Sequence, residues 1–343
     1  MRRVTASAPG KLFLAGEYAV LAGAPALVAA VDRRAQVRVQ LEPGAGSLEV
    51  ESLAEGTRRV IHDPERDPLG GGDAGAVLAA LRSARAAAPS LAAVRARVVV
   101  DTRAFLADGQ KLGLGRSAAT VAAAVAALLA GAGRQDGGEI LQAALAAHAR
   151  FQEGRGSGAD VAAAVRGGLL EFRRDAGAVT VAARALPRGL HLLVGWSGQG
   201  GATDPLLRRV ADGASRPRAL RDLSAVAERA AAAVERGDAA ALLDAVASTA
   251  DLLARLGDET GIPIVTPALA RLVAAARRLG VAAKPSGAGG GDCGIAIVTS
   301  AAQADAVVAA WRAEGIVPLP VAIAAEGVCH EGHEEVASEV SVG

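Results

Sequence analysis

The sequence predicts an α+β protein of two lobes, and three observations lead to this prediction. The length of 343 residues is enough for two domains with separate cores. Segments with the patterns of strands and of helices alternate along the chain in two blocks. Stretches rich in Gly and Pro separate the elements within each block. We therefore expect an N-terminal lobe over residues 1–180 and a C-terminal lobe over residues 181–343.

The first block combines strand segments with alanine-rich helices. The segment VRARVVVDTR is rich in β-branched residues, which favour strands. A loop of Gly, Pro and Asp residues at 62–75 ends before an alanine-rich run, where a helix is expected to begin. In chain order, strands are expected at 35–42, 47–52 and 94–103, and helices at 76–88, 117–131 and 138–151.

The second block has a helical middle with strands on both sides. Three strands are expected between 167 and 196, and the pattern from about 203 to 279 is helical. The polar tail from Gly327 is expected to be loosely ordered. The remaining elements are expected as helices near 217–236, 239–256, 266–279 and 301–313, and as strands at 294–298 and 316–324.

Composition and charge exclude several classes of protein. Hydrophobic residues make up 51% of the chain but aromatic residues only 2%, so the cores are expected to consist of Ala, Val and Leu. With 37 basic and 36 acidic residues, the net charge of +1 gives no overall field that would favour nucleic acid. Two cysteines cannot form a disulfide framework, and no apolar run has the character of a signal peptide or a membrane span. We therefore expect a soluble, cytoplasmic protein without a nucleic-acid or membrane partner.

Three glycine-rich motifs stand out, and the first is APGKLFLAGEYAV at 8–20. Lys11 follows a Pro-Gly turn, and Glu17 and Tyr18 follow another glycine. A lysine and a carboxylate placed around tight turns could form a pair that faces a substrate. The alternative is a buried strand with ordinary turn residues.

The second motif, KLGLGRSAAT at 111–120, has the composition of a phosphate-binding loop. Gly113 and Gly115 let the backbone approach an anion closely, and the helix expected next presents unpaired N–H groups. The hydroxyl of Ser117 either caps this helix or binds a metal ion that accompanies a phosphate. The spacing matches neither the Walker A loop nor the dinucleotide fingerprint. A plain helix entry with a serine cap is the alternative.

The third motif, KPSGAGGGDCGIAIV at 284–298, places four glycines in the five positions from Gly287 to Gly291. Bare backbone amides before a buried strand either receive an anion or allow two chain segments to touch. Lys284 and Asp292 flank the glycines within apolar sequence. Charges held in this way disfavour a flexible linker.

In this order and at these spacings, the three motifs resemble those of the GHMP kinase superfamily, named for galactokinase, homoserine kinase, mevalonate kinase and phosphomevalonate kinase. The resemblance covers nearly the whole chain. In particular, the chain resembles the bacterial-type phosphomevalonate kinases. Tyr18 stands where mevalonate kinases usually have a histidine, and Lys111 directly precedes the GLG turn. The segments 156–165, 196–210 and 257–269 are also similar to that subfamily, whereas diphosphomevalonate decarboxylases have a different first motif.

The resemblance implies a two-lobed GHMP kinase fold with the active site in the cleft between the lobes. It implies transfer of the γ-phosphoryl group of ATP to 5-phosphomevalonate, with Mg²⁺ as the metal ion, in the mevalonate route to isoprenoids. The positions that match the family's catalytic residues are Lys11, Lys111 and Asp160, and the position that matches its metal ligand is Ser117. The ATP-binding positions are Lys111, Gly113, Leu114, Gly115, Arg116, Ser117, Ala118 and Ala119. The acceptor-binding positions are Lys11, Glu17, Tyr18, Ser157, Gly158, Ser286, Gly287, Ala288, Gly289 and Gly290.

The chemistry of such a transfer explains the demand for lysines. Phosphoryl transfer needs mainly positioning and charge neutralisation. A phosphate acceptor, with a second pKa of about 6, is already largely ionised at neutral pH, so a strong base is less necessary than for an alcohol. We therefore interpret Asp160 as an orienter of Lys11 rather than an obligatory base, and a helix N-terminal acid is the alternative. The glutamate that mevalonate kinases use for the metal corresponds to Ala149, and Glu153 is off register, so the second metal ligand is open.

Arg116 departs from the family motif, which reads GLGSSAA where this chain has GLGRSAA. The arginine could add a cation against the ATP phosphates, or point to solvent or to a nearby carboxylate. It could also fill the phosphate pocket and leave a binding or regulatory protein on a kinase fold. The other motifs are intact, which favours a kinase.

Further alternatives remain open from the sequence. The chain could be a mevalonate kinase or another small-molecule kinase of the superfamily. Cys329, His330 and His333 could bind zinc, although the polar tail has no second Cys/His pair. Whether the protein forms a homodimer is also open.

Overall fold

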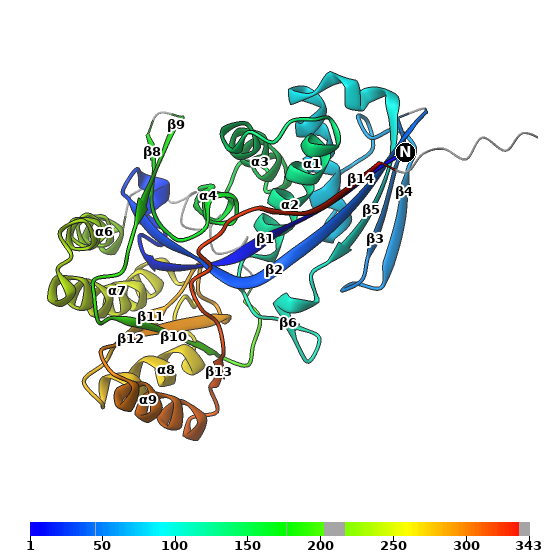
Figure 1. Cartoon of the computed structure of the whole chain (residues 1–343). Helices are drawn as coiled ribbons and strands as arrows, with labels where there is room; N and C mark the ends of the chain where they lie inside the picture. Colours follow the sequence, from blue (N-terminus) through cyan, green and yellow to red (C-terminus); the bar gives the residue numbers. More distant parts are fainter. Residues whose placement is uncertain (45, 176, 202–216, 336–343) are drawn as a thin grey trace, which may run out of the picture.

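The computed structural model describes residues 1–44, 46–175, 177–201 and 217–335, and it has two lobes, each built on its own β-sheet (Figure 1). Strands of the first sheet run on to Arg184, and the second sheet begins at His191. The lobe boundary at 180/181 stays a prediction. Our interpretations of 202–216 and of the last residues of the tail, 336–343, lie outside the described residues.

The first lobe is built on an eight-stranded sheet in which two long strands, β1 (Arg2–Ala15) and β2 (Ala26–Pro43), lie side by side. The order is β14-β1-β2-β5-β3-β4, and β8 and β9 extend the sheet from the first half of β2. Strands β3 and β5 run parallel, and the other pairs named here are antiparallel. The other strands are β3 (Leu48–Ser52), β4 (Thr57–Ile61), β5 (Val94–Asp101), β8 (Leu169–Asp175), β9 (Ala178–Arg184) and β14 (Cys329–Glu335).

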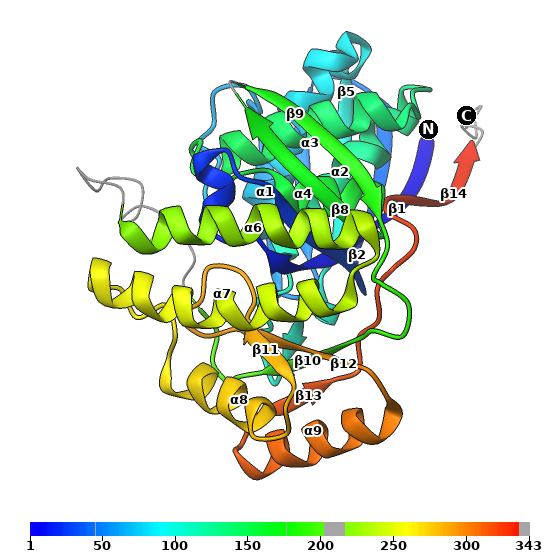
Figure 2. The same cartoon turned by 90° about the vertical axis from the view of Figure 1, so that its left-hand side faces the viewer.

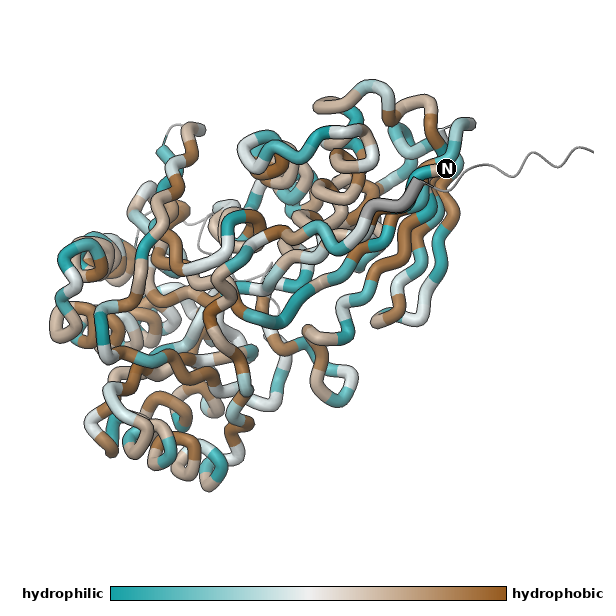
Figure 3. Tube along the Cα trace, in the orientation of Figure 1, coloured by the Kyte–Doolittle hydropathy of each residue, from teal (hydrophilic) through white to brown (hydrophobic). Residues whose placement is uncertain are grey.

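Burial on both faces explains why β2 is longer than the sequence predicted. We expected a strand only over 35–42, where apolar and polar residues alternate. The first residues of β2, 26–31, are all buried, so this part of the strand shows no alternation to read. Figure 3 shows hydrophilic and hydrophobic residues alternating along the outer strands of this lobe, where one face meets water. The predicted strands at 47–52 and 94–103 are confirmed as β3 and β5.

Four helices cover one face of the first sheet, and α2 (Arg116–Gly131) lies at their centre (Figure 1). All residues of α2 from Ala118 onward are buried. Its run of alanines allows α1 and the strands β1 and β2 to approach closely. The helices predicted at 117–131 and 138–151 are therefore confirmed to within one residue. The other helices are α1 (Gly72–Ala87), α3 (Gly137–Phe151) and α4 (Ala159–Arg166), with short 3₁₀ turns η1 (Ala19–Ala22), η2 (Pro89–Ala93) and η3 (Arg103–Phe105).

The second lobe is a four-stranded sheet in the order β11-β12-β10-β13, with α8 and α9 packed against it. Helices α6 and α7 lie side by side between this sheet and the first lobe (Figure 2). The predicted helices of this region are confirmed. Of the strand expected at 316–324, only Val317–Leu319 forms a strand, β13. The elements are β10 (His191–Trp196), α6 (Arg218–Arg236), α7 (Ala239–Thr260), α8 (Pro267–Arg277), β11 (Ala282–Pro285), β12 (Cys293–Val298), α9 (Ala301–Ala313) and β13 (Val317–Leu319).

The polar tail is ordered over β14, so our expectation of a loose tail is wrong for Cys329–Glu335. This strand returns to the first lobe and pairs with β1, from Ser7 opposite Cys329 to Arg2 opposite Glu335. An edge strand needs backbone hydrogen bonds but no apolar side chains, which is why its polar sequence resembled a loop. Among the side chains that the structure describes, no three His, Cys, Asp or Glu gather as metal ligands. The side chain of His333, one of the three candidate zinc ligands, lies outside that set, so the zinc alternative is not tested. No described helix is long and apolar enough to cross a membrane.

Candidate active site

A cavity of about 610 Å³ lies between the two lobes and brings the three glycine-rich motifs together. Its walls also include the start of α1 and the segment between α3 and α4. The predicted site residues that line it are Lys11, Glu17, Tyr18, Lys111, Gly113, Leu114, Gly115, Arg116, Ser117, Ser157, Asp160, Ser286, Gly287 and Ala288.

Five predicted site residues lie behind the cavity wall. Ala118 and Ala119 are fully buried in α2, where their side chains belong to the core. Gly158 precedes α4 in a left-handed conformation, with φ of 90°. Gly289 and Gly290 pack against the backbone of Ile264, to which the N–H of Gly290 donates a hydrogen bond of 2.9 Å. The two alanines therefore belong to the core, and the three glycines shape the loops around the cavity.

The second motif forms a cradle that fits an anion. Gly113 and Gly115 have φ of 76° and 81°, the left-handed region that favours glycine. Gly115 is the N-cap residue of α2, and no side chain of the described chain caps this helix. The first turn also lacks acidic residues. The open N–H groups and the helix dipole therefore suit a phosphate group.

The first motif places Lys11 against this cradle. The N–H of Lys11 donates to the carbonyl of Leu114 at 2.8 Å, and its Nζ donates to the carbonyl of Gly113 at 3.4 Å. A Cβ at Gly115 would lie 2.8 Å from the Lys11 side chain, so glycine is needed there for the close approach. Lys111, at the end of the short hairpin of β6 (Leu106–Ala107) and β7 (Gln110–Lys111), is exposed and lines the same cavity. Two cations thus flank the glycine loop.

Glu17 forms a buried ion pair with Lys284, which corrects our expectation of a pair with Lys11. Lys284 is fully buried and also donates to the carbonyls of Phe13 at 3.1 Å and Pro285 at 2.8 Å. Burial lowers the pKa of Lys284, and the adjacent carboxylate of Glu17 opposes that shift. These partners are 267 residues apart, so no local pattern could reveal the pair.

The third motif is joined to the first by hydrogen bonds on one side of the cavity. Ser286 Oγ accepts the N–H of Phe13 at 2.9 Å and donates to the carbonyl of the same residue at 3.1 Å. The hydroxyl of Tyr18 donates to the carbonyl of Ala288. Burial, followed by the nearby charge of Glu17, raises the pKa of Tyr18, which keeps this donor protonated. The two motifs therefore form one continuous wall.

Asp292 joins the third motif to the second, and the sequence analysis did not assign it to the site. Its backbone has φ of 59°, and a Cβ at Gly113 would lie 2.2 Å from the Cβ of Asp292. Its Oδ1 accepts the N–H of Gly201 at 2.7 Å. Burial raises the pKa of Asp292 against the opposing effects of this N–H, Lys11 and Lys111. The signal in the sequence was a charged residue directly after a run of glycines.

Ser117 and Asp160 meet through a residue that the sequence analysis missed, His148 of α3. The imidazole Nε2 lies 3.3 Å from Ser117 Oγ, and Nδ1 lies 3.8 Å from Asp160 Oδ1. Asp160 is in the first turn of α4, with its side chain 19% exposed. Orientation of Lys11 by Asp160 stays a prediction.

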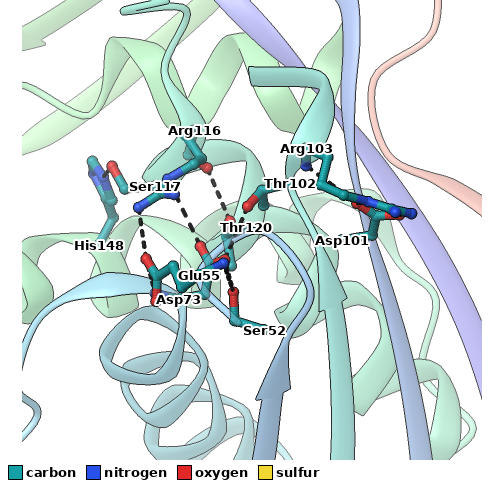
Figure 4. Close-up of polar contacts among 10 residues, drawn as sticks. All are labelled: Ser52, Glu55, Asp73, Asp101, Thr102, Arg103, Arg116, Ser117, Thr120 and His148. Carbon is teal, nitrogen blue, oxygen red and sulfur yellow. Dashed lines mark hydrogen bonds and ion pairs between the residues drawn. The ribbon is translucent and has the colours of Figure 1, made fainter. Parts of the chain in front are cut away.

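Arg116 pairs with carboxylates, as one of the three interpretations held. Its Nη2 lies 2.8 Å from Glu55 Oε1, and its Nε lies 3.9 Å from Asp73 Oδ1. Figure 4 shows the guanidinium directed toward these acids, while Ser117 lies beside His148. Arg116 and Asp73 both line the cavity, and the charge of Arg116 is matched by Asp73 and Glu55.

The residues present fit a magnesium ion that accompanies a nucleotide. The hydroxyl of Ser117 and the carboxylate of Asp160 line one cavity, and both are hard oxygen donors of the kind that Mg²⁺ prefers. Ala149, the position of the expected glutamate, offers no such donor.

Fold and site define a class of protein. The chain belongs to the GHMP kinase family, and residues 230–317 match the family model described as GHMP kinases C terminal. It is 37% identical to a phosphomevalonate kinase of Streptomyces sp. (strain CL190), over 95% of this chain and 99% of that protein. It is 32% identical to a mevalonate kinase of Aeropyrum pernix, over 87% and 89%.

A solved structure shows the same fold. The phosphomevalonate kinase of Streptococcus pneumoniae in complex with phosphomevalonate and AMPPNP matches with a TM-score of 0.77 at 23% identity. The match covers 93% of this chain and 99% of that chain. The prediction of a two-lobed GHMP kinase fold is confirmed.

Proposed function

We propose that this protein is a phosphomevalonate kinase, which transfers the γ-phosphoryl group of ATP to the terminal phosphate of 5-phosphomevalonate. One observation carries the proposal: Lys11 and Lys111 flank an uncapped helix N-terminus in a cavity between the lobes. Two highly anionic substrates can be brought together only where such positive groups converge. The Streptomyces relative, named as a phosphomevalonate kinase, supports the choice of acceptor.

The roles of individual residues follow from their places in the cavity. The amides from Gly113 to Ser117 and the side chain of Lys111 would bind the ATP phosphates. Lys11, held at the cradle, would neutralise charge on the transferring group. The wall formed by Tyr18 and Ser286 would face the acceptor.

Ser117 and Asp160 would hold Mg²⁺, which neutralises charge on the nucleotide phosphates when bound. Replacing Asp160 with Ala should reduce kcat by at least about 100-fold, the lower end of the range for losing one group that stabilises charge in the transition state. The KM for ATP should change far less. Steady-state kinetics measures both, and an unchanged kcat would remove Asp160 from the mechanism.

The acceptor is tested with a substrate panel. Release of ADP is followed with mevalonate, 5-phosphomevalonate and 5-diphosphomevalonate, each with ATP and Mg²⁺. We expect turnover with 5-phosphomevalonate. Turnover with mevalonate alone would favour the mevalonate kinase alternative, which the Aeropyrum relative motivates. A chain with no turnover on any acceptor would be the binding or regulatory protein, an outcome that the pairing of Arg116 with Glu55 disfavours. A cytoplasmic location and a possible homodimer remain predictions from the sequence.

A further inference from the structure

His148 is a buried polar residue between two residues of the proposed metal site. Only 1% of its surface is exposed, and it lies in the last turn of α3. Helix α3 packs against both α2 and α4, the helices that begin near Ser117 and Asp160. A single side chain can therefore reach the N-termini of both helices.

The partners of the imidazole determine which nitrogen carries the proton. A neutral imidazole has one donor and one acceptor nitrogen. Nδ1 lies 3.8 Å from Asp160 Oδ1, which is too far for a hydrogen bond. The negative charge of that carboxylate nevertheless favours the neutral tautomer whose proton is on Nδ1. The other nitrogen, Nε2, must then accept, and Ser117 Oγ lies 3.3 Å away with a hydroxyl proton to donate.

This assignment fixes the direction of the Ser117 hydroxyl. Once its proton points to His148, the lone pairs of its oxygen are turned to other directions, including the cavity that Ser117 lines. A hydroxyl binds a cation through such lone pairs. The adjacent ring of Phe151, with its centroid 6.4 Å away, borders the imidazole on the same helix.

We propose that His148 is a positioning residue that orients the Ser117 hydroxyl toward the divalent cation of the nucleotide, and that the nearby charge of Asp160 favours the tautomer in which Nε2 accepts the Ser117 proton. The proposal rests on the proposed kinase function and deepens it, because it assigns the metal site a residue outside the three glycine-rich motifs. Groups of this kind typically contribute about 10- to 100-fold to metal affinity.

Two amide substitutions separate the two contacts of His148. The amide of Asn occupies the position of Nδ1, and that of Gln the position of Nε2. His148→Gln can still accept the proton of Ser117, whereas His148→Asn can face only Asp160. We therefore expect Gln to keep the metal affinity within about 3-fold of the parent and Asn to lose at least about 10-fold.

The readout is metal binding without turnover. Free Mn²⁺ is counted by electron paramagnetic resonance in solutions of the protein with AMPPNP, a nucleotide that is not transferred. His62, which is exposed after β4, gives the matched control His62→Asn, expected to bind Mn²⁺ like the parent. Urea unfolding of each variant shows whether the fold is kept.

The outcomes separate positioning from packing. Equal Mn²⁺ affinity in the parent and both His148 variants would overturn the proposal, as would an equal loss for Asn and Gln. Because this experiment needs no acceptor, a failure of 5-phosphomevalonate as substrate would not change it. Conversely, unchanged Mn²⁺ binding would leave the phosphomevalonate kinase assignment intact.

Discussion

At the scale of single residues, Arg116 shows how a changed motif is accommodated. Glu55 accepts the N–H of Asp73 at 3.2 Å, at the start of α1, and pairs with Arg116. Asp73 is almost fully buried and also accepts hydrogen bonds from Ser52 at 2.7 Å and Thr102 at 2.9 Å. Arg116, the first residue of α2, is therefore linked to the first turn of α1 (Figure 4). Its positive charge offsets the repulsion between the carboxylates of Glu55 and Asp73.

Replacing Arg116 with Ser should lower stability more than it changes ATP binding. The pair with Glu55 is partly buried, with side chains 17% and 24% exposed. Its contribution to stability should therefore lie between that of a surface ion pair and that of a buried one. We expect a loss of about 1–2 kcal/mol in the free energy of unfolding, and Glu55→Gln in the same chain should recover part of it. The KM for ATP should stay within about 3-fold, which is less than about 1 kcal/mol.

Urea unfolding and steady-state kinetics test this prediction. Arg58→Ser is the control, because Arg58 pairs with Glu49 at 2.7 Å but is 57% exposed. That pair should contribute about 0–1 kcal/mol. A large rise in the KM for ATP without a loss of stability would place Arg116 on the phosphates instead.

Asp292 gives a pH-dependent prediction at the same scale. The pKa of Asp292 is higher in the folded protein than in the unfolded chain. The fold is therefore destabilised at pH values above the folded-state pKa, where the buried carboxyl is charged. Below the ordinary pKa of Asp the carboxyl is neutral in both states, and this destabilisation disappears. Asn remains neutral, tolerates the left-handed backbone and can still accept the N–H of Gly201. The variant Asp292→Asn should match the parent near about pH 4 and become the more stable of the two toward about pH 7. Urea unfolding at both pH values measures the difference, and a parent that is more stable at neutral pH would contradict it.

At the scale of elements, β14 shows that a polar segment can be an essential strand. It pairs with β1, which carries Lys11 and the start of the first motif. Without it, the outer edge of β1 would present unpaired backbone groups. The part of β1 directly before the first motif, residues 2–7, is thus paired with residues 329–335.

Removal of β14 should destabilise the first lobe. A chain that ends at Val328 should lose about 2–4 kcal/mol, from several backbone hydrogen bonds of about 1 kcal/mol each, and should aggregate more readily. A chain that ends at Glu335 keeps the strand and is the matched control. Urea unfolding and light scattering compare the two. Equal stability would show that β1 does not need this neighbour.

At the scale of the whole molecule, the cleft is fixed by contacts between the lobes. Lys284 of β11 belongs to the second sheet, whereas Glu17 lies two residues after the end of β1 in the first. Ser286 and Tyr18 add neutral hydrogen bonds to the same interface. The buried pair therefore holds the first and third motifs together between the lobes, in the wall that contains Tyr18 and Ser286.

Replacing one partner of the buried pair should lower the free energy of unfolding more than replacing both partners. Lys284→Met leaves a buried, unpaired carboxylate, and we expect a loss of about 3–5 kcal/mol. The double variant Glu17→Leu/Lys284→Met leaves no charge and should be more stable than the single variant. A double-mutant cycle in urea gives the coupling energy. Additive effects of the two substitutions would mean that the residues do not act as a pair.

The sequence by itself determined the features that depend on neighbouring residues. The helices at 116–131, 137–151 and 301–313 follow local periodicity, and the glycines of the second motif mark its turn. The family resemblance identified the fold and nearly half of the residues in the cavity wall, because those motifs are contiguous in the chain.

Only the tertiary structure decided which charges meet. Glu17 pairs with Lys284 rather than Lys11, Arg116 finds a partner 61 residues away, and His148 reaches two helix starts at once. Such contacts depend on the path of the chain between distant segments, and residue type alone carries no record of that path. The same holds for β14, whose hydrogen bonds come from backbone groups that every sequence possesses.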